Sequence, residues 1–524
     1  MIANFFSLFM GNTSKWYKYL IISFLVINPI LLTMFGKFTT GWVILLEFII
    51  ALALSLKCYP LLTGGIIAIQ AIFIKMVSVD TVYKEIQHNL GVILLLMFMV
   101  AGIYFMKDFL TWIFRKILFS TNSKITLSLM FCFMGAFLSA WLDALTVMAV
   151  MISVCTAFYE IYNEVSYEER VPEIEIDKNI SKEKLDDYIE EKRHEIGKKD
   201  LDNFKGFLRN LLMHGAIGTA LGGTMTMVGE PQNLLIAQIM QWGFKDFFMA
   251  MLHVSLPVLI FGLITVVILE KFKLFGYGYK LPERVLNVLE KNNEIENKNR
   301  SKSERLSIYL QGIGAIWLII ALAFHFAEVG LIGLSVIIFL AIFTGKNNEH
   351  TIGKAFEEAM PFTSLLIVFF AIVGVIQENN LFEPIIKTAF SFEGNQQIYA
   401  FFFASGILSA ISDNVFVATI YIQEVFKAFQ NNLINKEQLD SLAIAINIGT
   451  NIPSIATPNG QAAFLFLLTS GIATKLRLSY MTMLKMSLPY AIVLIIVSSI
   501  FINLNWISYE LPEIKTNVES QEKH

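Results

Sequence analysis

Cysteine is scarce in this chain of 524 residues, and several common motifs are missing from it. Its three cysteines, Cys58, Cys132 and Cys155, lie in apolar surroundings without Cys-x-x-Cys spacing, so we expect packing residues and neither a disulfide framework nor a metal cluster. The alternating short segments of a β-barrel do not occur. His-Glu-x-x-His, Gly-x-Ser-x-Gly and Gly-x-Gly-Asp strings are also missing, which argues against zinc, serine and intramembrane aspartyl hydrolases.

Apolar residues dominate the composition instead. Hydrophobic residues make up 55% of the chain and the mean hydropathy is +0.61, which is too apolar for a soluble protein of this length. Runs of about 17–20 apolar residues recur, and that is the length a helix needs to cross the hydrocarbon. We therefore predict an all-α polytopic membrane protein, without a cleaved signal peptide.

One acidic motif occurs twice inside long apolar runs. Leu138-Ser-Ala-Trp-Leu-Asp143 is repeated as Leu408-Ser-Ala-Ile-Ser-Asp413. A charged side chain near the bilayer centre costs roughly 2.5–3.5 kcal/mol on insertion scales, and intramembrane carboxylates therefore indicate a functional site. Two such residues in matching frames predict a duplicated site.

A second pattern follows each copy of the motif. Gly-Gly-Thr at 222–224 aligns with Gly-Thr-Asn at 449–451. Gly-Glu-Pro-Gln-Asn at 229–233 aligns with Ala-Thr-Pro-Asn-Gly at 456–460. In this register Glu230 stands opposite Thr457. Repeats with interrupted helices of this kind build many secondary transporters.

The apolar runs predict about eleven transmembrane helices and two re-entrant hairpins. Both arms of the first hairpin, 125–138 and 144–159, are short, and Asp143 and Asp413 are placed at the two hairpin tips. The spans are predicted at 17–35, 41–56, 61–77, 90–106, 207–240, 251–269, 307–324, 328–344, 361–377, 441–472 and 483–504, and the hairpins at 125–160 and 398–430.

Basic residues predict the orientation. If the N-terminus is cytoplasmic, the cluster around Arg115 and the polar segments 160–206 and 270–306 all fall inside, as the positive-inside rule requires. The two hairpins then enter from opposite sides, so the repeats are inverted. The predicted division is 1–124 scaffold helices with a dimerisation role, 125–270 first transport repeat with the soluble, partly helical insertion 160–206, 271–360 basic loop and scaffold helices, 361–505 second transport repeat, and 506–524 polar tail.

Oxygen ligands surround both predicted tips, as a hard cation such as sodium prefers. Burial disfavours an ionised carboxylate and a bound cation favours it, so Asp143 can hold either a proton or a sodium ion. We predict sodium at the Asp143 and Asp413 tips, with Glu230 assisting, and expect no cofactor. The remaining candidate ligands are Ser139, Thr146, Thr224, Thr226, Asn233, Ser409, Ser412, Asn414, Thr450, Asn451, Thr457 and Asn459.

Structural roles for the same residues stay open at this point. Asp143 and Asp413 can each cap a half-helix, and Glu230 can stabilise the helix that follows Pro231 through its N-terminal dipole. Gly218 and Gly222 have the spacing of a close helix contact.

Four strings of this sequence closely resemble the bacterial NhaB family of sodium/proton antiporters. They run from Phe137 to Val147, from Thr224 to Leu234, from Ser409 to Val417 and from Ala456 to Phe466. The resemblance implies an electrogenic exchanger of cytoplasmic sodium for external protons in the bacterial inner membrane, in contact with lipid and not with nucleic acid. It also implies a homodimer.

The alternative within the same superfamily is a sodium-coupled carboxylate symporter. Relatives of that kind often carry Asn or Ser-Asn-Thr where this chain has Asp143-Ala144 and Asp413-Asn414. Acidic tips disfavour an anionic substrate by charge repulsion, so antiport is the preferred interpretation.

Overall fold

The computed structural model describes residues 8–513 except 55, 56, 122, 169–181, 325, 411–413, 505 and 508. Within that part of the chain the regular structure is helical and no strand occurs. The helices are α2 Lys15–Ala53, α3 Pro60–Phe73, α4 Val79–His88, α5 Leu90–Tyr104, α6 Lys107–Leu118, α7 Lys124–Ser139, α8 Ala144–Glu168, α9 Lys182–Gly223, α10 Pro231–Met240, α11 Phe244–Phe272, α12 Glu283–Asn299, α13 Lys302–Ala323, α14 Val329–Phe343, α15 Glu349–Glu378, α16 Glu383–Phe390, α17 Asn395–Ser409, α18 Asn414–Gln430, α19 Lys436–Asn451, the 3₁₀ turn η1 Pro453–Ala456, α20 Ala462–Thr469, α21 Gly471–Lys475 and α22 Tyr480–Phe501. The prediction of an all-α membrane protein is confirmed.

The number of membrane crossings is lower than eleven when it is judged by helix length and composition. Six helices of the described chain are long and apolar enough to cross a bilayer, and seven if the bent pair α4 and α5 forms one span. The predicted spans each contain a helix, but α3 and α14, like the predicted hairpin arm α7, are shorter than a full crossing. The predicted count of eleven is therefore not confirmed.

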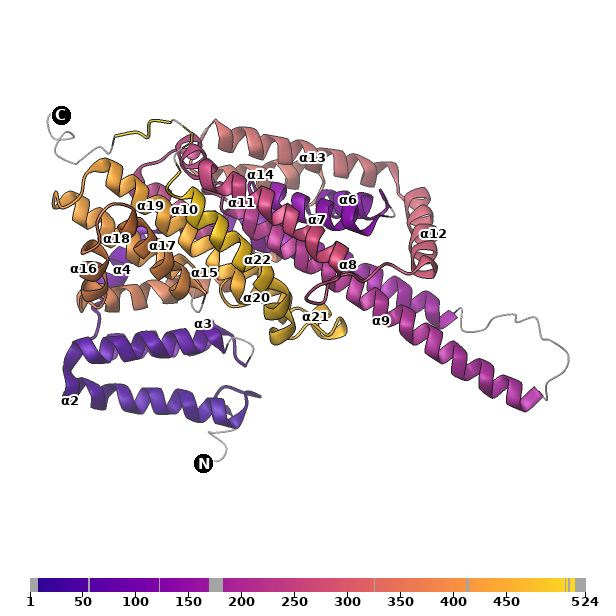
Figure 1. Cartoon of the computed structure of the whole chain (residues 1–524), viewed down its shortest axis with the longest axis horizontal. Coiled ribbons are helices and arrows are strands. Elements are labelled where there is room, and N and C mark those ends of the chain that lie inside the picture. Colours follow the sequence, from indigo (N-terminus) through magenta and orange to yellow (C-terminus); the bar gives the residue numbers. More distant parts are fainter. Residues whose placement is uncertain are drawn as a thin grey trace.

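The first two predicted spans are the two arms of α2. The helix is interrupted at Gly36, whose φ of 76° and ψ of −178° are not helical. A positive φ of this kind suits glycine, which has no Cβ to clash with the backbone. The two arms fold back against each other at this point and lie with α3 at one edge of the molecule (Figure 1).

Two repeats with the same construction form the centre of the fold. In the first, the hairpin α7–α8 packs against α9, which breaks before α10; in the second, the hairpin α17–α18 packs against α19, which breaks before α20. The repeats then exchange contacts, because α10 packs on α18 while α20 packs on α8. Their last long helices, α11 and α22, also pack together. Such reciprocal contacts are those of two elements related by a two-fold axis.

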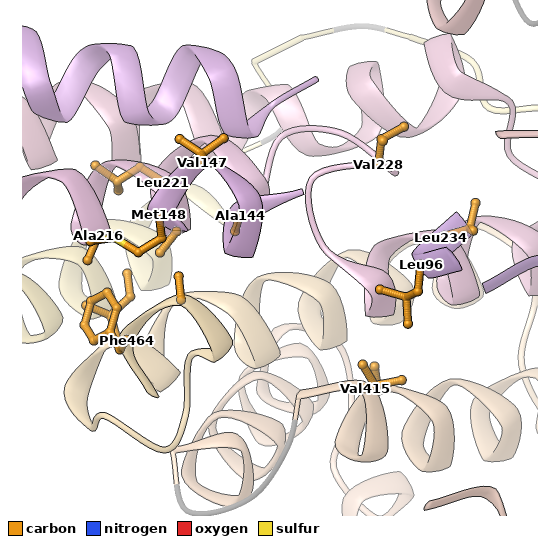
Figure 2. Close-up of a cluster of buried hydrophobic side chains, with 14 of the residues drawn as sticks. Leu96, Ala144, Val147, Met148, Ala216, Leu221, Val228, Leu234, Val415 and Phe464 are labelled. Carbon is orange, nitrogen blue, oxygen red and sulfur yellow. The ribbon is translucent and has the colours of Figure 1, made fainter. Parts of the chain in front are cut away.

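Apolar side chains fill the junctions between the repeats. Phe464 of α20 lies toward Met148 of α8, and Val415 of α18 lies toward Leu96 of α5 (Figure 2). All four side chains are buried. Close packing of this kind fixes the position of the broken helices relative to the hairpins.

A buried polar network joins three helices of the first repeat to the last helix of the second. Glu270 of α11 accepts from Lys124 Nζ at 2.5 Å and contacts His214 Nε2 at 2.8 Å. His214 Nδ1 in turn lies 2.8 Å from the hydroxyl of Tyr490 on α22. A buried charge needs such partners, so this network holds α7, α9, α11 and α22 together.

Two predictions about the first repeat need correction. The second hairpin arm is not short, because α8 offers a 19-residue apolar stretch, Ala144–Tyr162, that can span a bilayer. The next span does not begin near residue 207, because α9 is one 42-residue helix from Lys182 to Gly223, about 63 Å long. The predicted helical character of the insertion 160–206 is thus confirmed at both ends, where α8 and α9 extend away from the other helices (Figure 1), while 169–181 lie outside the described residues.

Candidate functional site

The turn between α7 and α8 carries Asp143. Its carboxylate accepts from the backbone N–H of Thr146 at 3.2 Å and from the Thr146 hydroxyl at 3.4 Å. Thr146 is the third residue of α8, so Asp143 caps this helix in the way that Asp and Asn favour. Asp143 is only 2% exposed. The capping role is therefore present, and the carboxylate is also withdrawn from solvent.

Ser139 lies at the end of α7 and differs from its counterpart in the second repeat. Its hydroxyl is fully buried and has no hydrogen-bond partner in the described chain. The equivalent Ser409 donates to Asn414 Oδ1 and lies 2.8 Å from the carbonyl of Thr450. Asn414 is replaced by Ala144 in the first repeat, so the sequence removes the acceptor and leaves the Ser139 hydroxyl for another ligand.

The break after α9 packs directly on the first hairpin tip. Thr226 donates through its hydroxyl to the carbonyl of Ala140 and accepts from Gly229 N at 3.3 Å. Asn233 Nδ2 donates to the carbonyls of Gly223 and Thr226, each at 2.7 Å, and so satisfies backbone groups that the broken helix leaves free.

The second break repeats this construction. Thr457 donates to the carbonyl of Ala410 and accepts from Gly460 N at 3.1 Å. Here the free backbone carbonyl is that of Asn451, and it accepts from Gln461 Nε2 at 2.8 Å. The contacts between the end of the first hairpin arm and the broken helix thus recur in both repeats.

These contacts correct the sequence alignment of the second motif by four residues. Thr226 and Thr457 make equivalent bonds, each to a hairpin carbonyl and to the glycine three residues later. Residues 218–233 therefore correspond to 449–464. Glu230 therefore corresponds to Gln461 and not to Thr457, and both stand immediately before a half-helix. The first alignment was wrong because it matched Gly222 with Gly449 and Pro231 with Pro458. In the structural register, Gly218-Thr219 corresponds to Gly449-Thr450.

A cavity of about 970 Å³ lies between the two repeats. Thr146 and Glu230 line it from the first repeat, and Asn414 and Asn459 line it from the second. Glu230 is 3% exposed and is the N-cap residue of α10, where its side chain makes no cap hydrogen bond, and a role through the helix dipole stays a prediction. The structure brings these four candidate residues together around one space.

The rest of the cavity wall comes from the surrounding helices. Leu52 and Pro60 contribute at the ends of α2 and α3, and Lys107, Glu357 and Thr474 contribute from α6, α15 and α21. Asp143 does not line the cavity, but its carboxylate is bonded to Thr146, which lines it.

Several predicted ligands also make structural hydrogen bonds. Thr224 donates to the carbonyl of Ala220 at 2.8 Å, and Thr450 donates to the carbonyl of Ile446 at 3.0 Å. Such bonds within a helix occupy the hydroxyl proton and leave the oxygen lone pairs, so both residues stay predicted ligands. Ser412 and Asp413 lie outside the described residues, so the second tip carboxylate stays a prediction.

An amide network between the repeats was missed by the sequence analysis. Gln232 Nε2 donates to Asn451 Oδ1 at 3.0 Å, and Asn451 Nδ2 donates to Asn233 Oδ1 at 3.0 Å. Asn233 and Asn451 therefore hold each other, and their role as ion ligands stays a prediction. Gln461 was also missed; its signal is its position immediately before the half-helix α20, as Glu230 precedes α10.

Two repeats that each pair a helical hairpin with a broken helix around a shared cavity define a secondary transporter of the inverted-repeat class. Comparison with known proteins identifies the family. The profile of Bacterial Na+/H+ antiporter B (NhaB) matches residues 1–514, and the chain belongs to this family.

Curated relatives agree with the family assignment. The chain is 53% identical to the Na(+)/H(+) antiporter NhaB of Shewanella denitrificans, over 94% of this chain and 92% of that protein. It is 52% identical to that of Yersinia enterocolitica over 97% of each chain, and 54% identical to that of a Marinomonas species over 94% and 96%. The resemblance inferred from the four sequence strings is confirmed.

Proposed function

We propose that this protein is a secondary active antiporter that exchanges cytoplasmic sodium for external protons. The names of its relatives support sodium and protons as the transported ions and do not favour carboxylate symport. The exchange is electrogenic and serves sodium and pH homeostasis. The protein is a transporter and not an enzyme.

The first repeat holds the main ion site, with Asp143 as the shared carboxylate and Ser139 as a neutral ligand. The observation that carries this role is the pair of buried oxygens at one tip: a carboxylate 2% exposed and a serine hydroxyl without a partner in the described chain. A carboxylate in such a place is stabilised either by a proton or by a cation. Binding of one ion therefore displaces the other, which is the exchange that antiport requires.

Glu230 and the second tip complete the ion path in this proposal. Glu230 and Asn459 line the cavity, so an ion that leaves Thr146 meets oxygen ligands from both repeats. Asp413 is proposed as the second ionisable site, with Ser412 beside it. Asn414, which also lines the cavity, lies next to that tip.

The cavity is proposed to face the cytoplasm. Its outer wall includes Lys107 and Thr474, next to basic residues that the positive-inside rule assigns to the cytoplasmic side. In this orientation the N-terminus is cytoplasmic, the protein lies in the bacterial inner membrane, and internal sodium reaches the site first. Helix α2 has many exposed apolar side chains. We propose that they contact lipid or form the homodimer interface implied by the resemblance.

Everted membrane vesicles test this function. Sodium added after a proton gradient has formed should collapse the gradient in vesicles that carry the wild-type protein, and it should not do so with Asp143→Asn. Asp80→Asn makes the same chemical change at an exposed position of α4 and should exchange like wild type. Full exchange by Asp143→Asn would rule out its assigned role, and sodium-driven uptake of a labelled dicarboxylate would favour symport.

A further inference from the structure

A second buried carboxylate lies in the scaffold helices, outside both repeats. Glu47 of α2 is 3% exposed and lies within an apolar arm of that helix. Its carboxylate accepts from Asn28 Nδ2 at 2.6 Å, and the same nitrogen donates to Gln70 Oε1 of α3 at 2.9 Å. The three side chains join both arms of α2 to α3.

The helix is modified around this cluster. Pro29 follows Asn28 inside α2 and has no N–H to donate, so the carbonyl of Leu25 loses its helical partner. Gln70 Nε2 donates to that carbonyl at 2.6 Å. Gln70 is thereby fixed in one orientation, with its side-chain oxygen turned toward Asn28 and Glu47.

No basic residue of the described chain pairs with Glu47. The charged groups on the neighbouring elements are used elsewhere: Lys18 donates to the carbonyl of Gly11, and Glu378 of α15 binds Ser78 and Thr81. A lone intramembrane carboxylate of this kind holds a proton or attracts a cation.

Asn28 supplies the second observation that points to a ligand. Its side chain is fully buried, and its Oδ1 has no hydrogen-bond partner in the described chain. Its Nδ2 sits 2.6 Å from Glu47 Oε2 and 2.9 Å from Gln70 Oε1, close to the roughly 2.3–2.6 Å at which protein oxygens hold calcium, a cation of similar size to sodium. The amide nitrogen therefore occupies the place that a small cation would take. For a cation to bind there, the amide must withdraw from Glu47 and rotate so that Oδ1 faces the cation.

We propose that Asn28, Glu47 and Gln70 form a second site that exchanges a proton for an alkali-metal cation, separate from the transport repeats. Without the cation, Glu47 carries the proton and Asn28 donates to it. With the cation bound, the proton leaves and oxygens of all three side chains are the ligands. The three residues do not line the cavity between the repeats, although Leu52, further along α2, does.

Infrared difference spectroscopy tests this site in the purified full-length protein. Sodium chloride is compared with choline chloride in an Asp143→Asn background, which removes the main proposed transport carboxylate and leaves Asp413 and Glu230 the same in every protein compared. We expect sodium to abolish the band of one protonated carboxyl group, and we expect this change to be missing in Asp143→Asn/Glu47→Gln. A spectrum that sodium does not change in Asp143→Asn, or that changes equally in both proteins, would overturn the proposal.

Asn28→Leu provides a second variant that leaves the carboxyl group in place. The protonated band should remain, and the sodium concentration that half abolishes it should rise at least tenfold. An unchanged half-effect concentration would show that Asn28 is not a ligand. Because Asp143 is already replaced in every protein, failure of this site is distinguishable from failure of the proposed antiport.

Discussion

Replacing Gly222 with alanine should separate the first hairpin from its broken helix. A Cβ atom at Gly222 would lie 1.8 Å from the carbonyl oxygen of Ala136 on α7 and 2.6 Å from its Cα. Ordinary contact between such atoms begins near 3.4 Å, so α7 and α9 would have to move apart by about 1.5 Å. Both contact atoms belong to backbone, and rotation of a side chain cannot relieve the clash.

The cost follows from this displacement. Overpacking a well-packed contact destabilises by about 1–3 kcal/mol, and loss of the hydrogen bond from Thr226 to Ala140 adds about 1 kcal/mol. Alanine recovers roughly 0.5–1 kcal/mol through helix propensity. We therefore expect a net loss of about 1–3 kcal/mol, together with a hairpin tip that no longer meets the break.

Thermal unfolding of the purified protein and sodium-induced exchange in vesicles measure the two effects. Gly353→Ala is the matched control, because it makes the same change at an exposed position of α15, where nothing lies within 4 Å of the new Cβ. Gly353→Ala should unfold at or above the wild-type temperature, whereas Gly222→Ala should unfold earlier and exchange less. Equal behaviour of the two variants would refute the argument that this close approach positions the tip.

Two further substitutions test contacts around the repeats. Glu270→Gln leaves the Lys124 ammonium without its buried ion pair and should destabilise by about 3–5 kcal/mol, most of which Lys124→Met in the same chain should restore in thermal unfolding. On α6, burial raises the pKa of Asp108, but the hydrogen bonds from Lys346 and Gln311 and the Lys346 charge outweigh burial and hold the pKa below its ordinary value. Because the folded pKa is lower than the unfolded pKa, the stabilisation is full above the unfolded pKa and is lost as the pH falls through the folded pKa. The half-exposed pair contributes under about 1 kcal/mol, and the difference in unfolding between wild type and Asp108→Asn should vanish in acid.

Sequence reasoning placed the hairpin tips because their signal is local. Apolar runs and the repeated Leu-Ser-Ala-x-x-Asp string mark the turn at Asp143, and the structure has a helix break there. The counterpart at Asp413 lies outside the described residues.

The register of the second motif and most ligand assignments could not be predicted in this way. Thr226 and Thr457 identify the register only through bonds to hairpins that are distant in the chain. The hydrogen bond between Asn233 and Asn451 also joins two residues that are distant in the chain. The sequence shows Glu47 as a single acidic residue within the predicted span 41–56. It does not show its neighbours, because Asn28 lies in the other arm of α2 and Gln70 lies in α3. The continuity of α9 was missed because a charged segment was taken as a boundary.

Proton release on sodium binding tests the central claim most directly. The purified protein is titrated with sodium in weakly buffered solution, and the protons released per chain are counted. Asparagine caps a helix as well as aspartate does, so Asp143→Asn should keep the fold and release one proton fewer per chain than wild type. Equal release by the two proteins would contradict the assignment of Asp143 as the carboxylate that a proton and a sodium ion share.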